Sequence, residues 1–285
     1  MEKINKILIF YILILAFVTV FVWSYIPQKS SGLLTVSFLD VGQGDSIFIE
    51  APNGKQVLID GGRNSSSVRE LSKFMSFKDK EIDVVLATHP DADHIGGLPE
   101  VFDRFQVLNF VDSGVEGEDN IYRSLVGRVS LDGSRYIKGE RGLVIILDRK
   151  EKVYLQVLSP DKNFTFEDTN NNSIVTKIVY GNTSFLLTGD ASKAIENILV
   201  YSDGEILDSD ILKAGHHGSK TSSSLLFLEA VSPEASVISA SANNTYGHPH
   251  ADVLTNLQKT NSLVFETAKE GNITFKTDGQ KIWRE

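Results

Sequence analysis

The chain has 285 residues, of which 41% are hydrophobic and 23% charged, a composition that allows one large globular domain or two small ones. Because it has no cysteine, disulfide bonds and metal sites built on thiolates are excluded. The formal net charge of −9 counts against a protein that holds nucleic acid through its overall electrostatic field. Any contact with phosphate backbones would need a local basic patch, or bound metal ions that supply positive charge.

The first predicted element is an apolar run without charges over residues 7–26, and a helix of about 20 residues is long enough to cross a bilayer. Lys3 and Lys6 precede the run, so the positive-inside rule places the N-terminus in the cytoplasm and the rest of the chain outside. A cleaved signal peptide, and hence a secreted protein, is the alternative. We expect a signal anchor over 1–27 and one large domain over 28–285.

Beyond this segment, the hydrophobic pattern alternates between strands and helices, which predicts an α/β (α+β) fold. The predicted strands cover residues 33–39, 46–50, 56–59, 82–87, 106–111, 136–137, 143–147, 153–158, 173–180, 184–187, 210–214, 235–240, 262–266, 272–276 and 281–283. The predicted helices cover residues 66–77, 99–105, 121–129, 191–201, 222–231 and 251–259, with Ser222 as the cap of the fifth.

The strongest chemical signal lies in the loop after strand 82–87, where two imidazoles and two carboxylates fall within six residues: His89, Asp91, Asp93 and His94. Carboxylates crowded in this way repel one another unless a cation neutralises them. Imidazole nitrogens and carboxylate oxygens are also suitable ligands for divalent metals. The pattern therefore predicts a metal site, with a solvated acidic turn as the alternative.

Other polar residues follow strands in the same way. Asp60 comes directly after strand 56–59, where an ordinary strand-ending turn is the alternative interpretation. His216 and His217 stand between glycines at the end of strand 210–214, so they can present their imidazoles to a pocket as ligands, general acids or phosphate contacts. A purely structural histidine pair is the alternative.

The metal loop resembles the His-x-His-x-Asp-His signature of the metallo-β-lactamase fold, with Asp91 in place of the second histidine. The chain is most similar to the ComEC type of that superfamily, the DNA-uptake proteins of competent bacteria, over residues 33–285. The motifs that carry this similarity, besides the metal loop, are Val41-Gly42-Gln43-Gly44-Asp45, His216-His217-Gly218-Ser219 and Tyr246-Gly247-His248-Pro249. The resemblance implies a four-layer αββα sandwich, which would follow the transmembrane helix predicted over residues 7–26. The exchange at Asp91 is also found in the related phosphorylcholine esterases, so it changes the expected metal and substrate and does not argue against a site.

The resemblance also implies two divalent ions, Zn²⁺ or Mn²⁺, with Asp190 as the carboxylate between them. The implied ligands are His89, Asp91, Asp190 and Asn171 for one ion, and Asp93, His94, Asp190 and His248 for the other. His216 is the reserve for His248, and Asp60 would orient the ligand histidines. Asn171 falls where the family carries a histidine, so this position is a weaker ligand or only part of an Asn-rich turn.

Two such ions would lower the pKa of a water molecule and stabilise a phosphoryl transition state, with Asp93 at the reacting centre. His216 or His217 would contact the phosphate or protonate the leaving oxygen, and Lys213 and Ser219 are further candidates for substrate contacts. The resemblance thus implies a phosphodiesterase, and the predicted anchor makes it membrane-bound and extracytoplasmic. Its expected substrate is single-stranded DNA, and its expected partners are other DNA-uptake proteins. The alternatives are a phosphocholine or cell-envelope substrate, or a non-catalytic DNA-binding subunit whose site has decayed; β-lactamase activity is disfavoured.

Overall fold

The computed structural model describes residues 2–25, 32–164 and 166–285, and the chain divides into two compact units, Met1–Ser31 and Gly32–Glu285. In the first unit, α1 is a helix over Glu2–Tyr25. Within the described residues, no helix combines the length and the apolarity that a bilayer crossing requires. The predicted membrane segment over 7–26 is therefore not supported by the structure, and its last residue, Ile26, lies outside the described residues.

The second unit is built on two mixed sheets, which contain eight and seven strands in the described part of the chain. The first sheet has the order β15-β14-β1-β2-β3-β4-β5-β6 and consists of β1 (Leu34–Phe38), β2 (Ile47–Glu50), β3 (Gln56–Ile59), β4 (Glu81–Ala87), β5 (Gln106–Asp112), β6 (Arg135–Lys138), β14 (Ile273–Thr277) and β15 (Ile282–Arg284). The second has the order β13-β12-β11-β10-β9-β8-β7 and consists of β7 (Val144–Asp148), β8 (Val153–Ser159), β9 (Val175–Tyr180), β10 (Thr183–Leu187), β11 (Ile211–Lys213), β12 (Ala235–Ile238) and β13 (Leu263–Glu266). Every predicted strand is present, with ends that agree within two residues.

Each sheet contains one run of parallel strands, β3 to β6 in the first sheet and β10 to β13 in the second. The carboxyl ends of parallel neighbours lie at the same edge of a sheet, and ligand sites in such sheets form there. Asp60 follows β3 and the metal loop follows β4, whereas Asp190 follows β10 and the His216–His217 pair follows β11. The topology therefore gathers at these two edges most of the polar residues that the sequence singled out.

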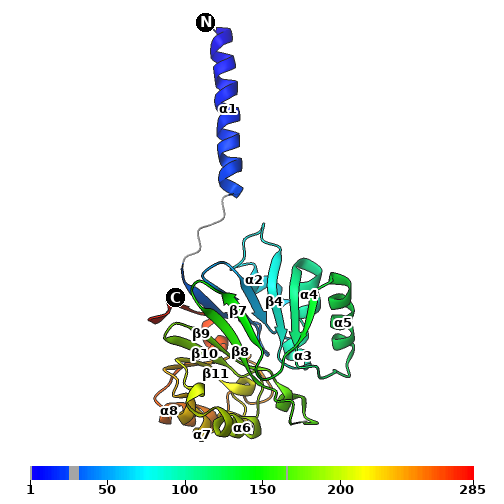
Figure 1. Ribbon diagram of the computed structural model, residues 1–285, viewed down its shortest axis with the longest axis vertical. Coiled ribbons are helices and arrows are strands. Elements are labelled where there is room, and N and C mark those ends of the chain that lie inside the picture. The colour runs from blue at the N-terminus through cyan, green and yellow to red at the C-terminus, as the bar shows by residue number, and fades with distance from the viewer. Residues whose placement is uncertain (1, 26–31, 165) are drawn as a thin grey trace. The chain divides into compact units, whose positions relative to one another are not determined.

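Helices cover the outer faces of both sheets, which gives four layers (Figure 1). Apolar side chains from both sheets fill the space between them and form the central core. The outer face of the first sheet packs against α2 (Ser66–Leu71), α4 (Leu98–Arg104) and α5 (Asn120–Asp132), and that of the second against α6 (Lys193–Asp203), α7 (Leu225–Val231) and α8 (Ala251–Lys259). The predicted mixed α/β sandwich with two sheets is thus confirmed.

One helix is shorter than its apolar spacing predicts. The pattern of Val68, Leu71 and Phe74 predicted a helix to residue 77, but α2 ends at Leu71 and the chain continues in turns. Phe74 still packs against the same outer core, so apolar spacing alone did not distinguish a helix from a turn here. The short helices were not predicted, because they are too brief for a periodic pattern: α3 (Ala92–Ile95), α9 (Thr267–Glu270), η1 (Thr169–Asn172), η2 (Gly204–Leu207) and η3 (Gly215–Gly218).

The predicted cap of α7 was wrong by two residues. Ser224, not Ser222, caps this helix, because its side chain accepts a hydrogen bond from the backbone N–H of Phe227. The Ser222 hydroxyl instead donates to the carbonyl oxygen of Gly215 at 2.6 Å. Ser222 therefore supports the loop that carries the histidine pair and leaves the capping to its neighbour.

Glu196 of α6 should make the protein less stable as the pH rises. Burial raises the pKa of this carboxyl. The backbone N–H groups of Ser223 and Ser224 donate hydrogen bonds to it and lower the pKa, but by less than burial raises it. Above the ordinary glutamate pKa of 4.5, the folded chain therefore holds this proton more tightly than the unfolded chain, and stability falls as the pH rises through the folded pKa. Each unit by which the pKa of the folded chain exceeds that of the unfolded chain corresponds to about 1.4 kcal/mol in the free energy of unfolding.

Urea unfolding of the wild type and of Glu196→Gln between pH 4.5 and pH 7.5 isolates this carboxyl, because all other titrating groups are common to both proteins. The free energy of unfolding of the wild type, relative to the variant, should decrease with pH. A difference that stays constant or increases with pH would contradict the assignment.

Candidate metal centre

The metal loop is built around close backbone packing. After β4, Asp91 caps the single turn α3, so that Asp93 and His94 lie within that turn. A Cβ atom at Gly96 or Gly97 would come within 2.1 or 2.2 Å of a backbone carbonyl oxygen of the 61–64 segment, so only glycine permits this approach. The Ile-Gly-Gly end of the motif therefore seats the loop against the segment that follows Asp60.

Asp60 orients His94. The Asp60 carboxylate is fully buried and accepts hydrogen bonds from the His94 ring (Nδ1, 2.7 Å) and from the backbone and hydroxyl of Thr88 (2.8 and 2.7 Å). With Nδ1 engaged, the other ring nitrogen of His94, Nε2, lies 3.3 Å from Oδ1 of Asp190. Asp60 thus has the geometry of the orienting partner that the sequence implied.

Four buried side chains come together where the two parallel runs meet: Asp45, His94, Asp190 and His217. One possible ligand atom from each lies within 4.8 Å of the others, as found among the described residues. His217 donates through Nδ1 to the Ser239 carbonyl oxygen at 2.9 Å, which leaves Nε2 at 3.3 Å from Asp190 Oδ2 and 3.4 Å from Asp93 Oδ2. Two imidazoles and two carboxylates therefore face one small volume.

The polar atoms that face this volume fit a cation. In the described structure, Nε2 of His94, Nε2 of His217 and Oδ1 of Asp190 are buried and have no hydrogen-bond partner. Buried polar atoms are costly unless something satisfies them, and these nitrogen and oxygen donors suit a divalent metal. The residues present are thus chemically suited to an ion at this position.

A second group lies beside the first. His89 is buried, its Nε2 has no hydrogen-bond partner among the described residues, and that atom is 3.7 Å from Asp91 Oδ2. Thr169 of η1 donates to the other oxygen of Asp91 at 2.7 Å and so fixes that carboxylate. His216 reaches Asp190 from the solvent side, with its Nε2 3.6 Å from Asp190 Oδ2. Asp190 is therefore close to His216 as well as to His94 and His217.

Two of the implied ligands, Asn171 and His248, are not among the four residues of the first buried group. The side-chain oxygen of Asn171 accepts a hydrogen bond from the Ser192 hydroxyl. The His248 ring centre is 5.8 Å from that of His216 and 6.5 Å from that of His217, and the ring stacks on Tyr246. The second imidazole of that group is that of His217, which the resemblance had named only as a contact to the phosphate or leaving oxygen.

The position of Lys213 differs from what the sequence led us to expect. It was a candidate for substrate contact, but its side chain is fully buried, and its ammonium lies 2.5 Å from Asp45 Oδ2. It also donates to the carbonyl oxygen of Gly189 at 2.8 Å. A buried ammonium held in this way does not reach a substrate. Ser219, the other candidate, is also buried, and its hydroxyl oxygen accepts from that of Thr221 at 3.0 Å.

Asp45 has no role that its sequence context predicts, although it ends the Gly42-Gln43-Gly44-Asp45 motif. The only signal was an acid after two glycines at the end of a strand, which is common in ordinary turns. In the structure, the backbone N–H of Asp45 donates to the carbonyl oxygen of Asp93 at 3.3 Å, and the N–H of Gly62 donates to that of Asp45 at 2.7 Å. This turn therefore links the metal loop to the segment after β3.

The electrostatic field at the centre is strongly negative. Burial alone would raise the pKa of Asp190, but the His217 and His94 imidazoles hold that pKa well below its ordinary value. Burial opposes protonation of both rings, yet their pKa values lie well above the ordinary range, because Asp190 lies beside both and Asp60 beside His94. Both rings thus hold a proton more tightly than a free imidazole does. A divalent ion would displace these protons, so we expect metal affinity to increase with pH.

Gly44 should not tolerate a side chain. Its φ of +119° is unfavourable for other residues, and a Cβ atom there would lie 2.0 Å from the carbonyl oxygen of Asp93. We expect Gly44→Ala to lower the free energy of unfolding by about 1–3 kcal/mol and to weaken metal binding, because the Asp93 loop must move. Urea unfolding and competition with a chelating dye measure the two effects. Gly127→Ala is the matched control, since a Cβ atom in that helical position meets nothing within 4 Å; equal behaviour of the two variants would contradict the argument.

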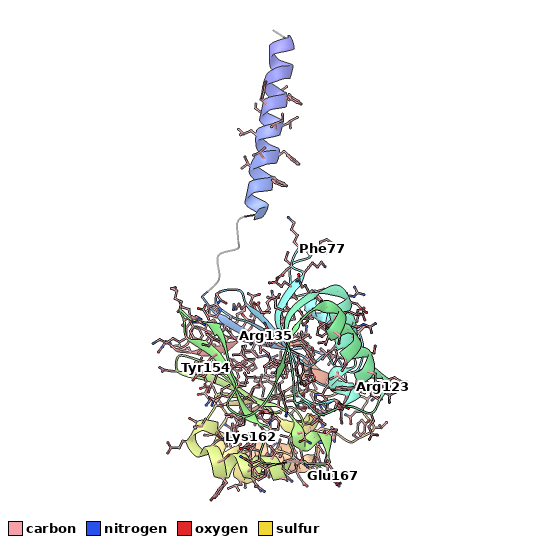
Figure 2. The ribbon with its side chains drawn as sticks, turned by 45° about the vertical axis from the view of Figure 1, so that its right-hand side comes forward. Phe77, Arg123, Arg135, Tyr154, Lys162 and Glu167 are labelled. Carbon is pink, nitrogen blue, oxygen red and sulfur yellow. The ribbon has the colours of Figure 1, made fainter. Side chains whose placement is uncertain are left out.

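A cleft of about 670 Å³ opens beside the centre, and its walls are acidic. Figure 2 marks Glu167 on one wall and Arg123 on α5, the helix that directly follows the other wall at residues 116–119. The lining also includes the positively charged Arg63 and the aromatic Tyr246. The carboxylates of the lining are Asp91, Asp93, Glu116, Glu118, Asp119, Glu167 and Asp168. A substrate that reaches the centre through this cleft therefore passes a negative surface.

Comparisons with known proteins agree on the fold. Residues 39–242 match the family model described as the metallo-beta-lactamase superfamily. The chain resembles Igni18, a metallo hydrolase from the archaeon Ignicoccus hospitalis, with a TM-score of 0.54 and 18% identity over 85% of this chain and 98% of that one. At this identity the likeness concerns the fold alone.

Among curated proteins, the chain is 32% identical to ComE operon protein 3 of Bacillus subtilis (strain 168) over 259 residues, which are 85% of this chain and 33% of that protein. It is 28% identical to competence protein ComA of Neisseria gonorrhoeae over 253 residues, 88% of this chain and 33% of that one. The chain thus spans about a third of the length of these competence-type relatives. With a family model that covers most of the sandwich and a relative above 30% identity, the chain belongs to the metallo-β-lactamase superfamily.

Proposed function

We propose that the chain is a metal-dependent hydrolase of phosphodiesters, with single-stranded DNA as its first candidate substrate. One observation carries this proposal. Buried ligand atoms of His94, His217 and Asp190 have no hydrogen-bond partner among the described residues, and an open cleft lies beside them. One ion is assigned to Asp93, His94, Asp190 and His217, and a second to His89, Asp91 and Asp190. Carboxylates and imidazoles in such a mixture suit Mn²⁺ and Zn²⁺.

Bound divalent ions would act as Lewis acids on a phosphoryl oxygen and lower the pKa of a water molecule. The protein supplies the rest of the chemistry through positioned side chains. Asp190 lies beside the Nε2 atoms of His94 and His217, and Asp60 and the Ser239 carbonyl hold these two rings in position through their Nδ1 atoms. His216 is partly exposed, so its Nε2 can donate a hydrogen bond to the phosphoryl group, whereas the buried His217 cannot.

DNA is supported as a substrate by the competence-type relatives, and other DNA-uptake proteins are the corresponding partners. The proposal includes an anchor at residues 7–26 with the hydrolase unit on the extracytoplasmic side. That part rests on the apolar run and on Lys3 and Lys6 alone.

A second candidate substrate is favoured by the acidic cleft. Its carboxylates repel a polyanion and attract a cationic group, which suits a phosphodiester that carries an ammonium, such as a phosphocholine ester. Tyr246, whose ring lines the cleft and is 61% exposed, is suited to contact such a cation.

The test uses the full chain, purified in detergent without chelator. Elemental analysis gives the bound metal, and hydrolysis is measured on single-stranded DNA, bis-nitrophenyl phosphate and nitrophenyl phosphocholine with added Mn²⁺ or Zn²⁺. Metal binding with DNA cleavage that is lost in Asp93→Ala supports the nuclease. Turnover of the phosphocholine ester without DNA cleavage moves the proposal to the second candidate. Absence of bound metal and of turnover with either ion overturns both and leaves a non-catalytic binding subunit.

A charge variant separates the two substrates further. The triple change Glu116→Gln, Glu118→Gln and Glu167→Gln should lower KM for DNA and raise KM for the phosphocholine ester, because it removes three negative charges from the cleft walls. The control changes three exposed glutamates that do not line the cleft, Glu205, Glu229 and Glu234. If both triple variants shift KM equally, the cleft does not select by charge.

A further inference from the structure

A lysine ammonium is embedded in the metal centre. Lys213, the last residue of β11, has no exposed surface, and its Nζ lies 2.5 Å from Asp45 Oδ2 and 3.6 Å from Asp190 Oδ1. A third contact goes to the carbonyl oxygen of Gly189 at 2.8 Å. An ion taken fully out of water is tolerated only where opposite charge and hydrogen bonds surround it, so this amine and its partners form one electrostatic unit.

Asp45 lies near the ligand atoms but behind the rings. Its oxygens are 3.9 Å from Nδ1 of His94 and 3.5 Å from Nδ1 of His217. The Nε2 atoms of the same rings face Asp190 instead, at 3.3 Å in both cases. Asp45 therefore approaches the side of each ring that faces away from the proposed ion, and its closest partner is Lys213.

The charges of this region come mainly from carboxylates. The described centre holds the buried acids Asp45, Asp60 and Asp190 and the partly buried Asp93, and the Lys213 ammonium lies within 4 Å of two of them, Asp45 and Asp190. Asp45 is neutralised by Lys213, and the remaining carboxylates stay available to the histidines and to an ion. Because Lys213 is also within 4 Å of Asp190, its charge lowers the attraction of the centre for any cation.

We propose that Lys213 is a positioning residue, a fixed internal cation that withholds Asp45 from metal binding and sets the affinity of the centre. This inference rests on the proposed metal function. It gives Lys213 an internal role in place of the substrate contact that was expected from the sequence. Its consequence is that the two partners of one ion pair act on metal affinity in opposite directions.

Lys213→Met removes the charge and keeps an unbranched chain of similar length. With the ammonium gone, Asp45 and Asp190 both attract the ion, so the dissociation constant for Zn²⁺ should fall by about tenfold or more. Asp45→Asn has the opposite effect. Lys213 then loses its counter-ion and pairs with Asp190, and the dissociation constant should rise by about tenfold.

The double variant Asp45→Asn/Lys213→Met removes the pair as a neutral unit. Its dissociation constant should return to within about threefold of the wild type, because the two single effects cancel. Competition with a chelating dye measures Zn²⁺ and Mn²⁺ affinity of the full chain, and circular dichroism verifies that each variant is folded. Asp45→Asn keeps the test decisive if Lys213→Met fails to fold, because a merely structural pair predicts no loss of affinity in a folded variant.

A second buried pair supplies the structural control. Arg141 makes a bidentate ion pair with the buried carboxylate of Asp203, away from the metal ligands. Arg141→Met should lower stability without changing metal affinity. If Lys213→Met and Asp45→Asn shift affinity in the same direction, or if neither shifts it, the inference is overturned while the metal function stands. If the wild type binds no metal, the metal function itself fails; if it binds metal but cleaves no ester, only the proposed hydrolysis fails.

Discussion

Replacing Asp190 by alanine should abolish high-affinity metal binding and lower the rate of phosphodiester hydrolysis by about 10³-fold or more. The carboxylate lies 3.3 Å from the Nε2 atoms of both His94 and His217, and 3.6 Å from that of His216. No other described residue has a carboxylate oxygen within ion-pair distance of all three rings. The loss should appear in elemental analysis and in kcat with bis-nitrophenyl phosphate.

The control for this variant is Asp203→Ala, which also removes a buried carboxylate but leaves the metal centre intact. It should be less stable than the wild type and keep its metal and its kcat. If Asp190→Ala retains metal and activity, the centre lies elsewhere. If both variants lose activity together with their folded structure, a milder change, Asp190→Asn, gives the answer.

Asp60→Asn should weaken metal binding by about 10–100-fold, although Asp60 is not expected to touch the ion. Its carboxylate accepts hydrogen bonds from the His94 ring and from two donors of Thr88. An asparagine offers only one oxygen, and its amide hydrogens face the Nδ1–H of His94, so the ring must turn or change tautomer. The unmatched buried donors should also lower the free energy of unfolding by about 1–3 kcal/mol.

Metal affinity and urea unfolding measured on the same protein samples check both effects. Asp83→Asn is the control, because Asp83 lies in the same sheet and, among the described residues, its carboxylate accepts a backbone N–H alone, that of Gln56, at 2.9 Å. A normal affinity in Asp60→Asn, with reduced stability, would mean that Asp60 supports the fold without orienting the ligand.

Local spacing in the sequence identified the metal loop, since His89, Asp91, Asp93 and His94 all lie in one turn after one strand. The sandwich followed from strand patterns and from the resemblance. The choice among the later histidines could not be made from sequence. His216 and His217 both have positive φ angles, 46° and 55°, and both rings reach Asp190, but the side chain of His217 is buried and that of His216 is partly exposed.

The role of Lys213 was also beyond the sequence. Lysines are usually exposed, and neither of its carboxylate partners is near it in the chain. Asp45 comes from the loop between β1 and β2 in the first sheet, and Lys213 from β11 in the second. Only the way in which the two sheets pack decides that these residues meet. Long-range pairing of this kind leaves no periodic trace in the sequence.

The proposed ion would take its ligands from both halves of the sandwich: Asp93 and His94 from the first sheet, and Asp190 and His217 from the second. It would therefore act as a reversible cross-link between two separately hydrogen-bonded sheets. An ion that binds only the folded chain stabilises it by mass action, by about 2.7 kcal/mol at a hundredfold excess over the dissociation constant. Metal supply would then govern how long the protein survives proteases, and a cell could regulate its abundance through the availability of an ion.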